Sequence, residues 1–285
     1  MQKIPSSLKP LAWFCLGWLI LLALIPFLMV LALSFFERGY ADFYILKLSL
    51  SAYLKLFDWI YLKVFLESLK LALITTFICL LMAYPFAYFV AQSPKKWRQF
   101  LFFLVIVPFW TSSLIRTYSL IAIIKTNGLL NKFLLSLGWI NTPIEILYTD
   151  WAVLIGLVYT MLPYMILPLY SSLEKMDHRL HEAAADLGAN NWNIFKKVTL
   201  PLSLPGILAG CILVFIPALG LFFIPDLLGG SKSLVLGSLI RDQFLITRNW
   251  PFGAALSVLL IGGMLFLMYF YQWTQKRQGN EGELI

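Results

Sequence analysis

The stretch E-K-M-D-H-R-L-H-E-A-A-A-D-L-G-A-N-N-W-N-I-F-K-K-V-T-L-P occupies residues 174–201 and joins two long apolar stretches. Residues Met176–Leu187 favour a helix, and Gly188 can adopt the left-handed backbone conformation that ends one. Apolar side chains at helical spacing predict a second, short amphipathic helix over residues 192–198. We therefore expect two short helices, separated by a glycine turn, between two apolar segments.

The composition of the whole chain indicates the solvent around this loop. Of the 285 residues, 60% are hydrophobic and 13% are charged, and the mean hydropathy is +0.82. A soluble domain carries about 25% charged residues and could not bury so much apolar surface in one core. Disorder and disulfide scaffolds are excluded as well, because 16% of the residues are aromatic and only three are cysteines. The chain is therefore predicted to lie in a membrane.

Six stretches are long and apolar enough for helices that cross the hydrocarbon core, which takes about 20 residues each. They are Leu11–Phe36, Val64–Ala91, Phe100–Ile124, Trp151–Leu173, Pro201–Gly229 and Pro251–Thr274. The first is longer than the apolar part of a cleavable signal peptide, so it is expected to remain as a membrane anchor. The predicted fold class is an all-α, polytopic membrane protein with six transmembrane helices.

The distribution of Lys and Arg predicts the orientation of these spans. The two termini, residues 92–99 and residues 174–200 hold 11 of these cations in about 56 residues. The opposite segments, 37–63, 125–149 and 230–250, hold nine in about 73 residues. Both termini and the 174–200 loop are therefore expected in the cytoplasm. The net charge of +8 follows from this topology, and no basic face interleaved with stacking residues indicates nucleic acid.

Charged side chains inside the spans are candidate functional groups, because each is costly in lipid unless it is paired or hydrated. Glu67, Lys70, Arg116 and Asp226 are expected in the outer half of the membrane. Pairing of Glu67 with Arg116 or with Lys70 is an alternative to a role in a substrate route.

Asp226 is the stronger candidate for contact with a substrate. Phe222, Phe223 and Pro225 surround it in what is predicted to be a broken helix. A carboxylate beside aromatic rings suits an organic cation, which gains both ion pairing and cation–π attraction. Arg241, in the loop that follows, could close such a site by competing for Asp226.

Proline and glycine also mark the spans. Prolines within lipid are tolerated where neighbouring helices or a water-lined cavity satisfy the freed carbonyl groups. They are Pro26, Pro85, Pro108, Pro163, Pro168, Pro217 and Pro225. Gly206 and Gly210 form a GxxxG pattern, which predicts close packing of the fifth span against another helix.

The 174–201 stretch also carries a motif with fixed spacing. Its members are Glu182, Ala183, Ala184, Gly188, Val198, Leu200 and Pro201. This resembles the EAA loop of the membrane subunits of bacterial binding-protein-dependent ABC importers, with valine at the position of the usual isoleucine. A chance match of this length has a probability on the order of 10⁻⁵. The resemblance implies a type I, MetI-like permease fold. It also implies that the motif residues other than Val198 couple the chain to an ATP-hydrolysing subunit.

Four further stretches resemble the permeases of spermidine/putrescine importers. They are V-P-F-W-T-S-S-L-I-R-T-Y at 107–118, G-L-V-Y-T-M-L-P-Y-M-I-L-P-L-Y-S-S-L-E-K at 156–175, P-A-L-G-L-F-F-I-P-D-L-L-G-G at 217–230 and N-W-P-F-G-A-A at 249–255. The similarity runs from about residue 13 to 273 and is weakest at 37–63. It implies a bacterial inner-membrane complex with a second homologous permease, two ATPase subunits and a periplasmic polyamine-binding protein.

The expected mechanism is alternating access for polyamines. The candidate residues along the route are Asp226, Phe222, Phe223, Trp110, Tyr118 and Tyr159, with Arg241, Arg116 and Glu67 as possible gate or ion-pair residues. An ABC permease for another small solute is the closest alternative. A secondary transporter is a more distant one, because no internal repeat is evident.

The chain is not expected to be an enzyme or to hold a cofactor. The P-loop pattern G-x-x-x-x-G-K-[ST] does not occur in it, so ATP and Mg²⁺ are expected to bind a separate ATPase subunit. His178 and His181 stand three residues apart, but they form no H-E-x-x-H pattern, and we expect no metal site.

The predicted organisation is a single transmembrane domain over residues 1–285. Residues 1–63 would form the first membrane helix and an external loop. Residues 64–274 would form a core of five helices with the coupling loop at 174–200.

Overall fold

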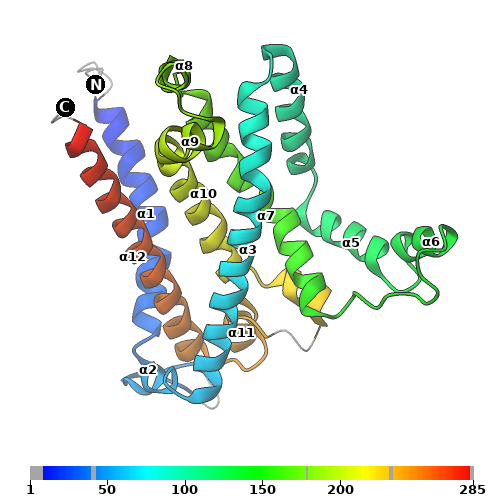
Figure 1. Cartoon of the computed structure of the whole chain (residues 1–285). Helices are drawn as coiled ribbons and strands as arrows, with labels where there is room; N and C mark the ends of the chain where they lie inside the picture. The colour runs from blue at the N-terminus through cyan, green and yellow to red at the C-terminus, as the bar shows by residue number, and fades with distance from the viewer. Residues whose placement is uncertain (1–8, 40–42, 178, 231–233, 283–285) are drawn as a thin grey trace. The chain divides into compact units, whose positions relative to one another are not determined.

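The computed structural model describes residues 9–39, 43–177, 179–230 and 234–282 (Figure 1). The chain forms two compact units, and the first comprises Met1–Leu62 and Leu239–Gly263. The second comprises Lys63–Ser238 and Met264–Ile285. The division at residue 63 and the single transmembrane domain proposed from the sequence stay predictions.

Helices make up most of the described chain, which confirms the all-α class. Their bounds are α1 Lys9–Leu33, α2 Ser51–Lys55, α3 Trp59–Gln92, α4 Lys95–Ile106, α5 Ser113–Ile124, α6 Leu129–Ser136, α7 Asp150–Glu174, α8 Arg179–Asp186, α9 Asn191–Ile194, α10 Leu200–Gly220, α11 Leu236–Leu245 and α12 Trp250–Gly282. Three further helical segments depart from α-helical geometry. They are the 3₁₀ turn η2 Val107–Trp110 and the π-helical segments η3 Phe195–Thr199 and η4 Pro225–Gly229. One short antiparallel hairpin, β1 Phe36–Glu37 with β2 Ile45–Leu48, follows α1.

Five helices of the described chain are long and apolar enough to cross a membrane, and a sixth span is a bent pair. The single helix predicted over Phe100–Ile124 is wrong in form. The chain bends by 97° between the helix ending at Trp110 and the one beginning at Ser113 (Figure 1). Pro108 lacks an amide proton, and Thr111 takes an extended conformation, so the helical hydrogen bonds do not continue. Hydropathy alone does not register this break, because both sides of it are apolar.

The fifth span also differs from its predicted bounds of Pro201–Gly229. Its helix starts earlier, at Asn191, and runs without a gap through η3 and α10 to Gly220. Beyond Gly220 the chain is extended at Leu221 and then forms η4, so the broken helix expected around Asp226 is confirmed. Most of the internal prolines lie in continuous helices, whereas Pro108 and Pro225 lie in the turns η2 and η4.

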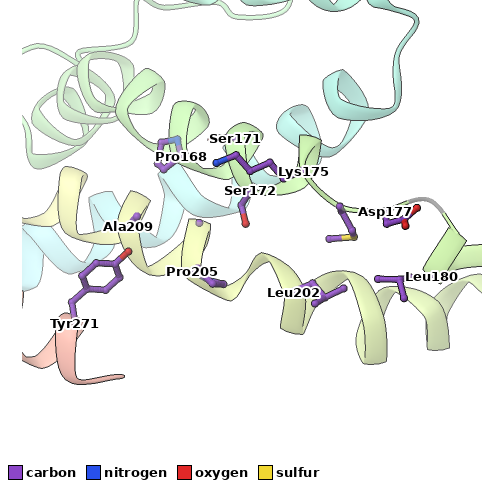
Figure 2. Close-up of a pocket in the computed structure, with 12 residues that line it drawn as sticks. Pro168, Ser171, Ser172, Lys175, Asp177, Leu180, Leu202, Pro205, Ala209 and Tyr271 are labelled. Atoms are coloured by element: carbon purple, nitrogen blue, oxygen red, sulfur yellow. The ribbon is translucent and has the colours of Figure 1, made fainter. Parts of the chain in front are cut away.

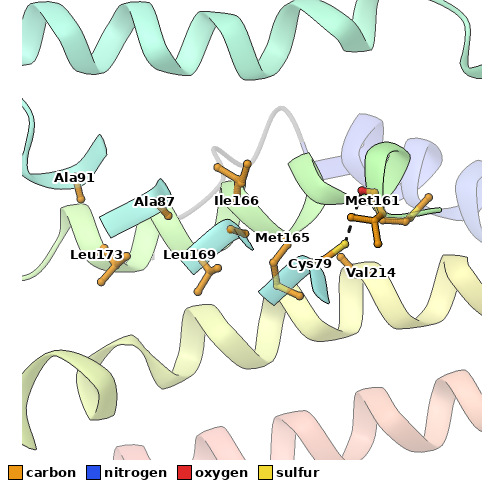
Figure 3. Close-up of a cluster of buried hydrophobic side chains, with 11 residues drawn as sticks. Cys79, Ala87, Ala91, Met161, Met165, Ile166, Leu169, Leu173 and Val214 are labelled. Carbon is orange, nitrogen blue, oxygen red and sulfur yellow. Dashed lines mark hydrogen bonds between the residues drawn. The ribbon is translucent and has the colours of Figure 1, made fainter. Parts of the chain in front are cut away.

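Helix α7 is the central helix of the second unit. Its most apolar 18-residue window is 61% buried, compared with 28% for α3. Small side chains on α3, among them Cys79, Ala83 and Ala87, leave room for the larger Met165 and Leu169 of α7 (Figure 3). This pairing of small with large side chains lets the two helices pack closely where lipid offers no hydrophobic driving force.

The predicted packing role of Gly206 and Gly210 is confirmed, and the neighbouring helix is α7. A Cβ atom on Gly206 would lie 2.9 Å from the carbonyl oxygen of Pro168 and 2.5 Å from Cβ of Ser172. A Cβ atom on Gly210 would lie 2.6 Å from Sδ of Met165. At Gly210 the Met165 side chain would have to move, whereas at Gly206 the backbone itself is too close for a side chain, so α7 and α10 are in backbone contact there.

Candidate functional site

The EAA loop, residues 174–200, is built around the turn at Gly188. Gly188 has φ of +79°, a conformation that favours glycine, and it ends α8 as expected. The amide of Ala189 donates to the carbonyl of Ala184 at 3.0 Å, and the amide of Gly188 donates to that of Ala185 at 2.8 Å. These two bonds form a Schellman motif, which satisfies carbonyl groups left open at the helix end. The three-residue spacing between Ala184 and Gly188 therefore has a local structural cause.

The second half of the EAA loop continues directly into a membrane helix. Asn190 caps α9, since its Oδ1 accepts a hydrogen bond from the amide of Asn193 at 2.9 Å. The π-helical segment η3 then leads into α10, which begins with Leu200 and Pro201. Residues 191–220 therefore form a single continuous helical rod.

An aromatic cluster anchors this half of the loop to α3. The ring of Phe195 meets Tyr84 edge-on at 5.8 Å and Tyr88 edge-on at 6.5 Å, and it stacks on Trp192 at 5.7 Å. The hydroxyl of Tyr84 also shares a hydrogen bond of 3.0 Å with Oγ of Ser203. Phe195 therefore belongs to the buried side of the amphipathic helix that its spacing predicted.

The opposite side of the EAA loop is exposed. Glu182 and Ala183 are exposed, Ala184 is half-buried, and Leu187 exposes 89% of its surface. Trp192 exposes 68%. A surface that exposes Leu187 beside the acids Glu182 and Asp186, with no bulk at two alanines, is suited to close contact with another protein. The coupling role of this surface stays a prediction.

One contact across the loop escaped the sequence reasoning. Nε2 of His181 on α8 lies 3.0 Å from Oγ1 of Thr199, which is fully buried at the end of η3. His181 therefore has a structural contact that joins the two halves of the loop. His178 lies outside the described residues, and the residues that are described hold no group of three metal-binding side chains.

Asp226, the main candidate for cargo contact, lies in η4 and is half-buried. Its Oδ1 accepts a hydrogen bond of 2.8 Å from Oγ of Ser238, which is buried in the first turn of α11. The positive end of the α11 dipole lies at the same place and stabilises a carboxylate. Sequence reasoning missed Ser238, because it lies twelve positions from Asp226 and on another element, α11.

The candidate aromatic residues fall into two groups. Phe222 and Phe223 lie just before η4, with their rings edge-to-face at 6.3 Å. The others are exposed side chains on different elements: Trp110 ends η2 and exposes 77% of its surface, Tyr118 lies on α5 and Tyr159 on α7. The structure therefore places Phe222 and Phe223 nearest in the chain to Asp226, and the shared role of all five stays a prediction.

The candidate ion pairs are arranged differently from the alternatives considered. Within the described residues, Glu67 forms no ion pair with Arg116 or Lys70. The guanidinium of Arg116 lies over the ring of Phe109, 5.5 Å from its centroid, and its buried Nε has no hydrogen-bond partner there. The cation therefore packs on an aromatic face beside the α4–α5 bend.

Arg241 forms an ion pair with the next residue, Asp242. Its Nη2 lies 2.6 Å and its Nε 2.9 Å from Oδ1 of Asp242. The proposed competition of Arg241 for Asp226 stays a prediction.

An open cavity of about 670 Å³ lies between the last turns of α7 and the first turns of α10 (Figure 2). Ser172 and Lys175 line one side, Leu202 and Pro205 line the other, and Tyr271 of α12 closes one end. None of the predicted route residues lines this cavity. It adjoins the EAA loop, so it leaves space beside the helices that the loop connects.

Comparison with known proteins decides the family. Residues 83–280 match the inner membrane component of binding-protein-dependent transport systems, and this range contains the whole EAA loop. The chain belongs to this family. The permease is 51% identical over 267 residues to the spermidine/putrescine transport system permease protein PotB of Escherichia coli, covering 93% of this chain and 96% of that protein.

Two other relatives show how far the similarity extends. The permease is 49% identical over 268 residues to PotB of Haemophilus influenzae, covering 94% of both chains. It is 30% identical over 250 residues to the inner membrane ABC transporter permease protein YdcU of E. coli, covering 82% of this chain and 77% of that one. The resemblance inferred from the motif spacing is therefore confirmed.

Solved structures confirm the fold class. The permease aligns with a chain of a bacterial ABC transporter that imports the acidic polysaccharide alginate, with a TM-score of 0.76 at 15% identity over 95% of both chains. A second structure, of the alginate transporter with a pentasaccharide-bound periplasmic protein, aligns with a TM-score of 0.76 at 16% identity, over 95% of this chain and 94% of that one. The shared fold is that of a multi-pass, inner-membrane ABC importer permease.

Proposed function

We propose that this permease carries spermidine and putrescine into the cytoplasm as one membrane subunit of an ATP-driven importer. The observation that carries the proposal is the 51% identity to E. coli PotB over 93% of the chain. Similarity of this extent includes the segments around Asp226 as well as the EAA loop. The partners would be a second homologous permease, two ATPase subunits and a periplasmic polyamine-binding protein.

The EAA loop would be the surface on which an ATPase subunit docks. Its exposed side offers Glu182, Ala183 and Leu187, and α9 leads through η3 directly into α10. Closure of the ATPase pair around ATP and Mg²⁺ would displace this loop. The helical rod from α9 to Gly220 would carry that displacement to the segment that holds Asp226.

The orientation of the permease follows from the density of Lys and Arg along the chain. The segments that include both termini and the EAA loop hold more of these cations per residue than the opposite segments, which supports a cytoplasmic location for them. The binding protein would then dock on the opposite face, over residues 37–63, 125–149 and 230–250. Cargo would enter from that side.

Asp226 with Phe222 and Phe223 offers the chemistry that a polyamine needs. A carboxylate pairs with an ammonium group, and aromatic faces attract the same cation. So few contacts would let a polyamine pass through the permease rather than bind it tightly. Selectivity between spermidine and putrescine would then reside mainly in the binding protein.

The test is reconstitution of the permease with its second permease, ATPase and binding protein in proteoliposomes. We expect ATP-dependent, saturable uptake of labelled spermidine or putrescine and no uptake of glutamate, the anionic control. ATP hydrolysis stimulated by the binding protein without uptake of either polyamine would assign the complex to another solute. Uptake that persists without ATP would indicate a secondary transporter instead.

A further inference from the structure

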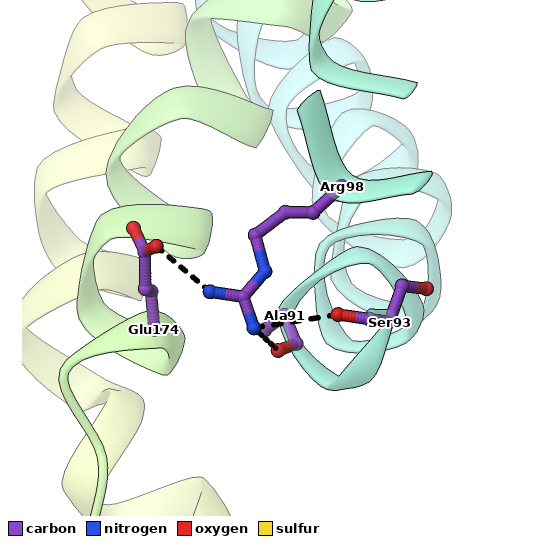
Figure 4. A network of polar contacts seen from close by, with 4 residues as sticks. All are labelled: Ala91, Ser93, Arg98 and Glu174. Carbon is purple, nitrogen blue, oxygen red and sulfur yellow. Dashed lines mark hydrogen bonds and ion pairs between the residues drawn. The ribbon is translucent and has the colours of Figure 1, made fainter. Parts of the chain in front are cut away.

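Arg98 joins three helix ends at the same level of the second unit. Its Nη1 forms an ion pair of 2.9 Å with Oε1 of Glu174, the last residue of α7 (Figure 4). Its Nη2 donates to the carbonyl of Ala91 near the end of α3 at 2.8 Å and to that of Ser93 at 3.4 Å. Arg98 itself lies in the first turn of α4. One planar guanidinium thus ties α7 to the turn of the α3–α4 hairpin.

Glu174 is the point at which α7 passes into the EAA loop. The loop is held at its other end by α10, and α7 and α10 are in backbone contact at Gly206. A force applied to the loop therefore moves these two helices together. The carboxylate of Glu174 connects the end of α7 to Arg98 of α4.

The cavity beside α7 shows why this contact matters. Ser172 and Lys175 line the cavity (Figure 2), whereas the carboxylate of Glu174 faces Arg98 (Figure 4). Toward α10, α7 is held by the close packing at Gly206. Toward the α3–α4 hairpin, the contact of Glu174 with Arg98 is a polar tie at this end of α7.

We propose that Arg98 is a positioning residue that carries movement of the EAA loop, through Glu174, to the α3–α4 hairpin. This inference rests on the proposed coupling function of the loop. Nη1 binds the carboxylate while Nη2 binds the two backbone carbonyls, so both the charge and the planar geometry of Arg98 contribute. Without it, the loop would move while α3 and α4 follow only through apolar packing.

The test uses the complete transporter in proteoliposomes and measures polyamine taken up per ATP hydrolysed. We expect Arg98→Ala to lower this ratio by about fivefold or more, the range of a moderate coupling between two sites. The ratio for Arg98→Lys should lie between those of the wild type and Arg98→Ala, because lysine keeps the charge but loses the planar guanidinium. The exchanged pair Arg98→Glu with Glu174→Arg should recover at least half of the wild-type ratio. Lys96→Ala, which removes a cation from the same turn of α4, is the matched control and should behave as wild type.

Stimulation of ATP hydrolysis by the loaded binding protein gives a second measurement that does not depend on which solute is carried. This stimulation should fall in Arg98→Ala and in Glu174→Gln. If Arg98→Ala does not assemble with its partner subunits, Glu174→Gln is used for the test instead. Wild-type stimulation and a wild-type uptake ratio in the Arg98 and Glu174 variants would overturn the inference. A wild-type complex that hydrolyses ATP in response to its binding protein but accumulates no polyamine would instead refute the proposed cargo.

Discussion

Oγ of Ser238 donates a hydrogen bond of 2.8 Å to Oδ1 of Asp226, and this bond joins the first turn of α11 to the π-helical segment η4. Gly220 ends α10 just before this segment, so Asp226 lies where the membrane helix is interrupted. The carboxylate is thus held in one orientation by a partner on another element.

Asp226→Asn is expected to lower the affinity for polyamine during uptake by about tenfold, because the amide loses its ion pair with an ammonium group. Ser238→Ala should have a smaller effect of the same kind, since the charge remains and only its orientation is freed. Initial uptake rates over a range of spermidine concentrations measure both. Co-purification with the partner subunits should be unchanged. Wild-type uptake kinetics in Asp226→Asn would remove this residue from the route.

Gly188→Asp is expected to leave the permease folded in the membrane but to uncouple it. The left-handed conformation at φ +79° costs a residue with a side chain roughly 1–2 kcal/mol, so the end of α8 would shift. Gly188→Asn is the milder comparison, because Asn tolerates this conformation better. ATP hydrolysis stimulated by the loaded binding protein measures the coupling. Full stimulation in the Asp variant would show that the turn has no coupling role.

Glu182→Lys tests the charge of the EAA loop without altering its backbone. Glu182 is exposed in the first turn of α8, so reversal of its charge should not disturb folding. We expect the ATPase subunit to bind this variant more weakly, since the proposed contact of Glu182 with basic groups of that subunit would become a contact between like charges. Retention of the ATPase during purification at increasing salt measures the effect. Asp186→Lys, on the same helix, is the control for charge alone.

Gly206→Leu is expected to destabilise the permease by about 1–3 kcal/mol, as overpacking does in other cores. The added Cβ alone would lie 2.9 Å from the carbonyl of Pro168, so α7 and α10 would have to separate. The melting temperature in detergent measures the effect. Gly262→Leu is the matched control, because no atom lies within 4 Å of a Cβ at that position. Equal melting temperatures for both variants would contradict the close contact of the two helices.

Local patterns predicted much of this structure. The turn at Gly188, the packing face of Gly206 and Gly210, and the broken helix before Asp226 each depend on residues within one or two helical turns. The bend between Trp110 and Ser113 was missed although it is also local, because the apolar side chains on both sides satisfy the length and hydropathy of a single span. Average hydropathy over a span does not register the loss of a few backbone hydrogen bonds.

By itself, the sequence determined that the chain suits lipid, which stretches are apolar enough to span a membrane, that Gly188 ends a helix of the EAA loop and, through its resemblance to known permeases, the family. The first three properties follow from composition and from spacing along the chain. The tertiary structure alone decided which side chains meet: Ser238 with Asp226, His181 with Thr199, and Arg98 with Glu174, 76 positions away. The physical reason is that the partner of a polar side chain depends on how helices pack. Many acids, cations and hydroxyls in the chain have equivalent chemistry, and only their positions in space select one pair.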